Sequence, residues 1–279
     1  MKNNKKLISI GVSVLVLLGA GIFGREELLD LLPQNQEVTQ QAPSSQTSSN
    51  GLQDPSTFYQ NNSAQINTLA QMDFKSGDNA IYQVDGGKST LDPDAWSTNK
   101  VIYGDLDSLN RTTFVTAFID QKNLGKSEGR DQQVFKPTGW HQKKVGNDYI
   151  YNRGHLLAYT SSFNLDIDGN YKQGETGSID NPKNLATQSA FSNQILQTHY
   201  EKLVRDAQKI KDNKVTYEII TVFRDQELMP RGYWLQAVDT NKTLNFNVYL
   251  FNVQPDVQFN YQDGTSKIDR SFKAEYSFE

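Results

Sequence analysis

The sequence predicts an α+β fold in which a central antiparallel sheet is flanked by helices. Several segments alternate apolar and polar residues and are rich in β-branched and aromatic side chains, which is typical of strands. The last three of these segments follow one another with only turn residues between them, which favours antiparallel pairing. One long segment before them repeats its apolar residues at helical spacing instead.

Five segments are predicted to be strands. In chain order they are 112–120, 147–155, 214–225, 232–239 and 244–254. The second, NDYIYNRGH, ends at His155 and should deliver this histidine into the polar loop that follows. Arg153, Gly154 and His155 bring together an anion-binding group, a residue that allows close backbone approach and a proton acceptor that works near neutral pH. This combination suits phosphate chemistry, although a tripeptide alone is weak evidence.

The clearest predicted helix covers residues 189–211. Its apolar residues at helical spacing are Ile195, Leu196, Tyr200, Leu203, Val204 and Ala207. Asn193, Gln197 and Glu201 follow one another every four residues, so they should form one polar stripe on this helix. The chain therefore runs from a strand with His155, through an irregular loop, to a helix with Asn193.

The chain is predicted to consist of three parts. Three lysines precede an apolar run from Leu7 to Phe23, the layout of an export signal whose positive end stays inside. An uncleaved membrane anchor is favoured, because GAGIFGRE offers only weak cleavage sites, but a cleaved signal remains open. We therefore expect a signal or membrane anchor at 1–32, a flexible Gln- and Ser-rich tether at 33–56 and a folded domain at 57–279, outside the cell membrane or secreted.

Composition limits the chemistry of the folded part. A hydrophobic content of 36% is sufficient for a core, and the absence of cysteine excludes disulfides, a thiol nucleophile and a thiolate zinc site. The net charge of −4 counts mildly against nucleic-acid binding. Between Gln121 and Arg153, however, seven basic and three acidic residues give a local balance of +4. This basic stretch runs into Asn-Arg-Gly-His, although an ordinary solvated loop would have the same composition.

Three motifs together resemble a known family. NRGH at 152–155, NPKNLATQSAFSNQ at 181–194 and then Glu201 are similar to the DNA/RNA non-specific endonucleases of the ββα-metal class. The likeness is strongest to membrane-associated DNA-entry nucleases and secreted nucleases of streptococcal type. The family signature is Asp-Arg-Gly-His, an asparagine, a second asparagine nine residues later and a glutamate eight beyond it, and Asn184, Asn193 and Glu201 fit these spacings. The similarity covers roughly Thr98 to Gln254.

The resemblance implies a role for each matching residue. His155 would be the general base, Asn193 the direct Mg²⁺ ligand and Arg153 an electrostatic partner of the phosphate. Asn184 and Glu201 would be supporting residues, with Glu201 ordering water at the metal. Arg130 is the best placed candidate for an upstream arginine that the family uses near the transition state. His141 and His199 match no catalytic position and are expected to be structural.

The function implied by the resemblance is a Mg²⁺-dependent, sugar-non-specific endonuclease, with Mn²⁺ as an accepted substitute. Its substrates would be double- and single-stranded DNA and also RNA, cut outside the cell to leave 5′-phosphate ends. Asn152 departs from the family pattern, which has aspartate there, and this puts the rate in doubt. A membrane-tethered nucleic-acid receptor on the same fold, with little activity, is therefore the alternative, but the presence of His155, Asn193 and Glu201 favours the enzyme.

Overall fold

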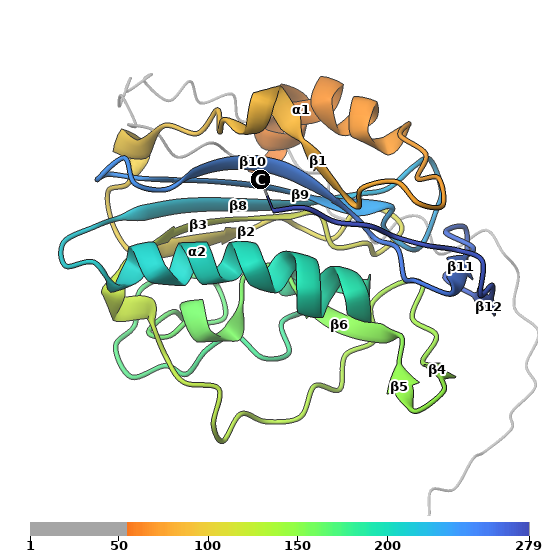
Figure 1. The fold of residues 1–279 in the computed structure, drawn as a ribbon. Coiled ribbons are helices and arrows are strands. Elements are labelled where there is room, and N and C mark those ends of the chain that lie inside the picture. The colour runs from red at the N-terminus through yellow and green to blue at the C-terminus, as the bar shows by residue number, and fades with distance from the viewer. Residues whose placement is uncertain (1–54, 279) are drawn as a thin grey trace, which may run out of the picture. The chain divides into compact units, whose positions relative to one another are not determined.

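The computed structural model describes residues 55–278 (Figure 1). The predicted membrane anchor and nearly all of the predicted tether lie outside these described residues. Within residues 55–278, no helix has both the length and the apolar character needed to cross a membrane.

A six-stranded antiparallel sheet lies at the centre of the fold, in the strand order β1-β10-β9-β8-β3-β2 (Figure 1). Its strands are β1 (Ile81–Gln83), β2 (Lys100–Tyr103), β3 (Phe114–Ile119), β8 (Val215–Val222), β9 (Gly232–Asp239) and β10 (Asn245–Phe251). The predictions of strands at 112–120, 214–225, 232–239 and 244–254 are confirmed, and so is their antiparallel pairing. Every residue of β8 and β9 is buried, since other elements cover both faces of the sheet.

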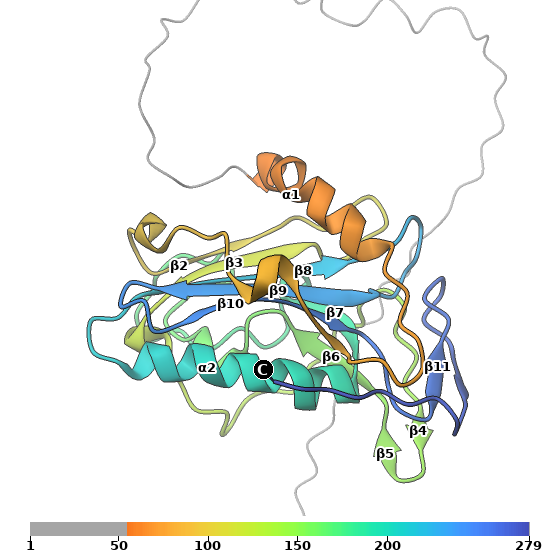
Figure 2. The same ribbon diagram turned by 45° about the horizontal axis from the view of Figure 1, so that its top comes forward.

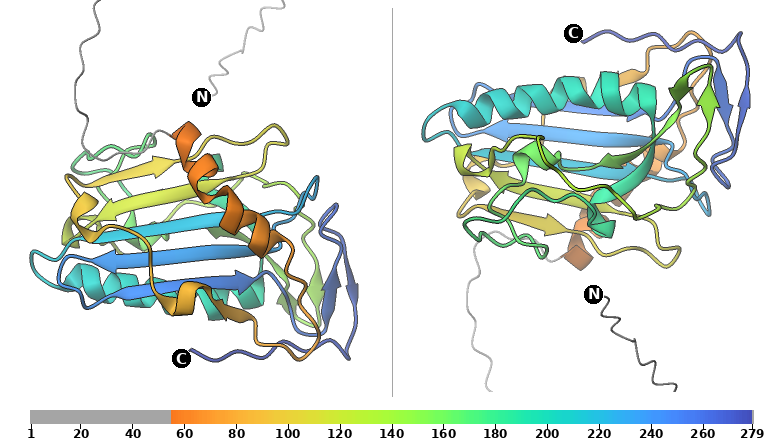
Figure 3. Two further views of the ribbon diagram at one scale, coloured as in Figure 1. Left: turned by 90° about the horizontal axis from the view of Figure 1, so that it is seen from above. Right: turned by 90° about the horizontal axis from the view of Figure 1, so that it is seen from below.

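Two helices lie on opposite faces of this sheet. Helix α1 (Pro55–Ala70) crosses one face, and α2 (Thr198–Lys209) runs along the other (Figures 2 and 3). The side of α2 that packs on the sheet carries three of the predicted core residues, Tyr200, Val204 and Ala207, and a fourth, Leu196, is buried just before α2 begins. The other two, Ile195 and Leu203, remain 42% and 37% exposed.

The face covered by α2 also holds a β-β-α unit. Strands β6 (Tyr151–His155) and β7 (Leu185–Ser189) pair in antiparallel fashion, and the helix follows β7 without a loop. Asn152 lies opposite Gln188 in this pair, and His155 lies opposite Leu185. The fold therefore places the NRGH motif directly beside the start of the helix.

The predicted helix at 189–211 is correctly located, but the prediction of a regular helix is wrong at its start. Residues Ser192–Gln197 form a wide π-helical segment in which the Thr198 N–H donates to the Asn193 carbonyl. Tertiary contacts satisfy the first turn, because the backbone N–H of Phe191 donates to Gln254 Oε1 at 2.9 Å. The widened turn shifts Asn193 relative to the regular α2 that follows.

The predicted strand at 147–155 is interrupted at Ile150, which is buried. Its first part, β5 (Asp148–Tyr149), pairs with β4 (Lys144–Val145), and its second part is β6. Strands β11 (Val257–Phe259) and β12 (Ser266–Ile268) form a further pair. Short 3₁₀ turns complete the described chain: η1 (Val84–Gly87), η2 (Pro93–Ala95), η3 (Gln121–Asn123), η4 (Tyr159–Ser161) and η5 (Pro182–Asn184).

Candidate active site

A polar cavity of about 360 Å³ lies where the β-β-α unit meets the loops around it. Five of the six residues predicted from the sequence line it: Arg130, Arg153, His155, Asn193 and Glu201. Asn152, the residue that departs from the family pattern, lines it as well. These residues come from a loop, a strand and a helix, so only the tertiary fold brings them together.

His155 closes strand β6 with its ring fixed in one orientation. Its Nε2 lies 2.9 Å from the carbonyl oxygen of Ile179. Because a carbonyl can only accept, Nε2 carries the hydrogen in this contact and the neutral ring keeps Nδ1 as its proton acceptor. Burial lowers the pKa of His155 to about 4, against the hydrogen bond to Ile179, and the positive charge of Arg130 lowers it further. The histidine is therefore a neutral base at physiological pH.

The Asn193 carboxamide is held by two neighbours on strands β6 and β7. Its Nδ2 donates to Gln188 Oε1 at 2.9 Å, and its Oδ1 accepts from Asn152 Nδ2 at 3.1 Å. Because an amide oxygen has two lone pairs, Oδ1 can accept from Asn152 and still coordinate a cation. A hard oxygen ligand in a polar cavity fits Mg²⁺, which keeps several waters and needs few protein ligands. Within residues 55–278 no group of three or more His, Cys, Asp or Glu side chains is placed to bind a metal.

The contact between Gln188 and Asn193 leaves no room for a side chain at position 154, which is a glycine. A Cβ atom at position 154 would lie only 2.1 Å from Gln188 Oε1. That oxygen is the one that holds Asn193 in place. The glycine of the NRGH motif therefore serves close packing between β6 and the Gln188 side chain of the paired strand.

Glu201 is connected to His155 through Gln197, which is fully buried. Gln197 Nε2 donates to the His155 carbonyl at 2.7 Å and to Glu201 Oε1 at 3.0 Å. Burial raises the pKa of Glu201, while Gln197 and Arg205 lower it. Arg205 Nη1 lies 3.5 Å from Glu201 Oε2. The sequence prediction missed Arg205, although its spacing of four residues from Glu201 on one helix was a usable signal.

Asn184, the sixth predicted residue, is fully buried and does not line the cavity. Its Oδ1 accepts from the backbone N–H of Leu157 at 2.9 Å, and its Nδ2 donates to the Leu157 carbonyl at 3.0 Å. It thereby fixes the chain just after His155. Its position suits the supporting role expected of it.

The two arginines differ in how firmly they are held. Arg153 Nη1 donates to the Gln133 carbonyl at 2.7 Å, and its guanidinium lies 4.9 Å from the centre of the Trp140 ring. Its Nε is buried and has no hydrogen-bond partner among the described residues. Arg130 is exposed at the cavity edge. Both supply positive charge to the cavity.

The two remaining histidines lie outside the cavity. His141 Nε2 is 2.9 Å from the Asp263 carbonyl oxygen, and the His199 ring stacks on Phe278 with 3.8 Å between ring centres. These contacts agree with the structural roles expected for both.

A β-β-α unit packed on a central antiparallel sheet is the arrangement of the ββα-metal nuclease fold. The chain belongs to the DNA/RNA non-specific endonuclease family, which it matches over residues 76–269. The protein is therefore a nuclease, a hydrolase of phosphodiesters, from a metal-dependent family.

Solved structures of similar proteins agree with this assignment. NucA from Streptococcus agalactiae with magnesium ion bound is 25% identical, with a TM-score of 0.61, over 74% of this chain and 95% of that chain. NucA with no metal bound gives a TM-score of 0.60 over the same shares. Sda1 nuclease with bound zinc ion, 18% identical over 67% of this chain and 95% of that chain, shares the fold with a TM-score of 0.52.

Proposed function

We propose that this protein is a Mg²⁺-dependent, sugar-non-specific endonuclease that uses His155 as its general base. The observation that carries the proposal is the anchoring of His155 Nε2 to the Ile179 carbonyl, in the same cavity as Asn193. This leaves Nδ1 of a neutral ring to take a proton from water. Similarity to NucA, whose structure includes a bound magnesium ion, supports Mg²⁺, and Mn²⁺ should substitute for it.

In the proposed reaction, a water molecule attacks the phosphorus and gives its proton to His155 Nδ1. The bond between phosphorus and the 3′ oxygen breaks, so the phosphate stays on the 5′ end and the 3′ oxygen takes a proton from solvent. Bound Mg²⁺ would supply Lewis-acid stabilisation of the charge that develops on the phosphate. Arg130 and Arg153 attract the same charge electrostatically, and Glu201 orders water on the helix side of the cavity.

The substrates we propose are double- and single-stranded DNA and also RNA, met outside the cell. All of the proposed groups act on the phosphate or on water, which supports an activity that does not depend on the sugar. The extracellular setting, on the membrane or secreted, rests on the predicted signal or anchor at 1–32.

The test is cleavage of supercoiled plasmid and of single-stranded RNA by the full-length protein, with Mg²⁺, with Mn²⁺ and with a chelator. We expect both substrates to be cut with either metal and neither with the chelator. The products should accept a labelled phosphate from a polynucleotide kinase only after phosphatase treatment, since their 5′ ends already carry one. Cleavage that persists without metal, or products with free 5′ hydroxyls, would refute the proposal.

A further inference from the structure

A row of polar side chains crosses the middle of the central sheet. Thr116 of β3 pairs in register with Glu218 of β8, Glu218 with Gln236 of β9, and Gln236 with Asn247 of β10. All four are buried, and Glu218 is only 4% exposed. A charged side chain in the centre of a buried strand is costly unless a partner satisfies it, so this row calls for an explanation.

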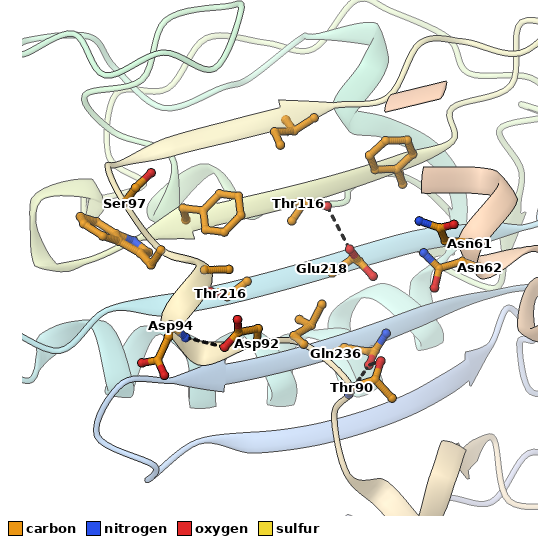
Figure 4. A pocket seen from close by; sticks show the side chains of 16 residues that line it. Asn61, Asn62, Thr90, Asp92, Asp94, Ser97, Thr116, Thr216, Glu218 and Gln236 are labelled. Carbon is orange, nitrogen blue, oxygen red and sulfur yellow. Dashed lines mark hydrogen bonds between the residues drawn. The ribbon is translucent and has the colours of Figure 1, made fainter. Parts of the chain in front are cut away.

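Three residues of this row, Thr116, Glu218 and Gln236, line a cavity of about 790 Å³ (Figure 4). This cavity lies on the α1 side of the sheet, because Asn61 and Asn62 of α1 line it, whereas α2 and the β6-β7 pair lie on the other face. Its apolar lining comes from Leu91, Trp96, Ile102, Phe114 and Phe118. Its size is that of a typical small-molecule site.

Several hydrogen-bonding groups in this cavity are unused. Thr216 is 3% exposed, and its hydroxyl has no hydrogen-bond partner among the described residues. Trp96 Nε1 is likewise buried without a partner in that part of the chain. The Glu218 carboxyl accepts from Thr116 Oγ1 at 3.0 Å, which leaves further lone pairs available. Buried groups of this kind are normally satisfied, so each of them points to a ligand.

The unused groups determine what the ligand must offer. Trp96 Nε1 can only donate, so the ligand needs an acceptor there, whereas Glu218 needs a donor. Thr216 and Glu218 are two residues apart on one strand, so their side chains stand on the same face at a separation of roughly 7 Å. The aromatic walls favour a flat ring between these polar contacts. A simple polyamine offers no acceptor and no flat face.

Lys214 Nζ lies 4.4 Å from the centre of the Trp96 ring, but the charged residues that line the cavity itself disfavour phosphate. Glu218, Asp92 and Asp94 line it, and no lysine or arginine is among the described lining residues. Burial raises the pKa of Glu218 to about 7, so near neutral pH its carboxyl can accept from an amine and also donate. An uncharged ligand with both kinds of group therefore fits better than a nucleotide.

We propose that the cavity under α1 binds an amine-bearing heteroaromatic ring without a phosphate, of the class of nucleobases and nucleosides. The amine donates to Glu218, a ring acceptor receives the Trp96 Nε1 hydrogen, and the Thr216 hydroxyl bonds the ring edge between them. Because this site lies on the opposite face of the sheet from His155, its occupation does not depend on the nuclease reaction.

Binding is tested by calorimetry and thermal unfolding of the full-length protein with adenosine and cytidine, which carry an exocyclic amine. Uridine lacks the amine, AMP adds a phosphate, and spermidine is a cation without a ring. We expect adenosine or cytidine to bind and to raise the melting temperature, and the three comparison compounds to bind at least about tenfold more weakly. Binding of spermidine alone, or of none of the compounds, would overturn the proposal.

Two variants locate the ligand. Trp96→Phe keeps the aromatic wall but removes the indole N–H, and Thr216→Val removes the unused hydroxyl at nearly constant volume. Each should weaken nucleoside binding by about tenfold, a loss typical of one hydrogen bond. Plasmid cleavage by both should match the wild type. His199→Ala, on the other face, is the control and should bind normally. If both pocket variants bind like the wild type, the ligand sits elsewhere and the assignment is wrong.

Discussion

At the scale of single residues, the contact between Asn152 and Asn193 distinguishes this nuclease from the family pattern. Asn152 Nδ2 donates to the amide oxygen that we propose as the metal ligand. This contact occupies one of the two lone pairs of Asn193 Oδ1 and adds no negative charge to the site. An aspartate at position 152 would instead place a carboxylate oxygen beside that amide oxygen, an arrangement that a cation between them would stabilise.

Asn152→Asp should therefore raise cleavage at sub-millimolar Mg²⁺. The added negative charge attracts the metal and raises the basicity of the nearby histidine. The acidic limb of the pH–rate profile should therefore move to higher pH. At saturating Mg²⁺ the gain should fade, because the same charge repels the incoming phosphate. Paired Mg²⁺ and pH titrations of variant and wild type measure both effects. Superimposable curves would show that position 152 does not influence the metal.

Asn193→Ala should raise the Mg²⁺ concentration needed for half-maximal cleavage at least about tenfold, because it removes the proposed direct ligand from a site with few protein ligands. His199→Ala is the matched control on the same helix and should leave the Mg²⁺ titration unchanged, since its ring stacks on Phe278 instead. The reverse ranking of the two variants would contradict the metal assignment.

At the scale of elements, the sequence predicted what depends on local pattern. Alternation located β3, β8, β9 and β10, and apolar periodicity located the helix. Apolar periodicity did not reveal the π-helical start, nor the hydrogen bond that the Phe191 backbone N–H donates there to Gln254, a side chain some sixty residues further along the chain. Gln188 was missed for a similar reason: its role exists only once β7 lies beside Gly154. The family motifs nevertheless named five of the residues that line the cavity, because their spacing is set by the fold that brings these residues together.

The pairing of β6 with β7 predicts the effect of a single methyl group. Gly154→Ala should lower the free energy of unfolding by about 1–3 kcal/mol and raise the Mg²⁺ requirement, because the new Cβ displaces Gln188 from Asn193. Adding Gln188→Ala should relieve the steric clash but not restore the metal affinity, since Asn193 then keeps only its contact with Asn152. Chemical denaturation and Mg²⁺ titration of the three proteins check this. Wild-type values for Gly154→Ala would rule out the packing role.

At the scale of the whole molecule, the two faces of the sheet make opposite contributions to stability as the pH changes. Burial raises the pKa of Glu218 from 4.5 to about 7, so the folded protein keeps a proton in this window that the unfolded chain releases. Stability from this group is therefore lost as the pH rises. Burial lowers the pKa of His155 from 6.5 to about 4, so the unfolded chain binds the proton and stability is lost as the pH falls. The two effects partly cancel in the wild type.

The Glu218→Gln variant should separate the pH effect of Glu218 from that of His155. Relative to the wild type, the variant should gain stability as the pH rises from about 4.5 to about 7, by up to about 3 kcal/mol, and the difference should then level off. Denaturant unfolding at a series of pH values measures this difference. A difference that is constant across the range would mean that Glu218 does not titrate abnormally in the folded protein.

The central claim is that His155 is the general base of a phosphodiester hydrolase, and the cleavage rate of His155→Ala tests it most directly. With saturating Mg²⁺ and a circular dichroism spectrum like that of the wild type, the variant should cut plasmid about 10²-fold more slowly or worse. Added imidazole should restore part of the rate by filling the vacated space. A folded His155→Ala protein that cleaves at the wild-type rate would contradict the account.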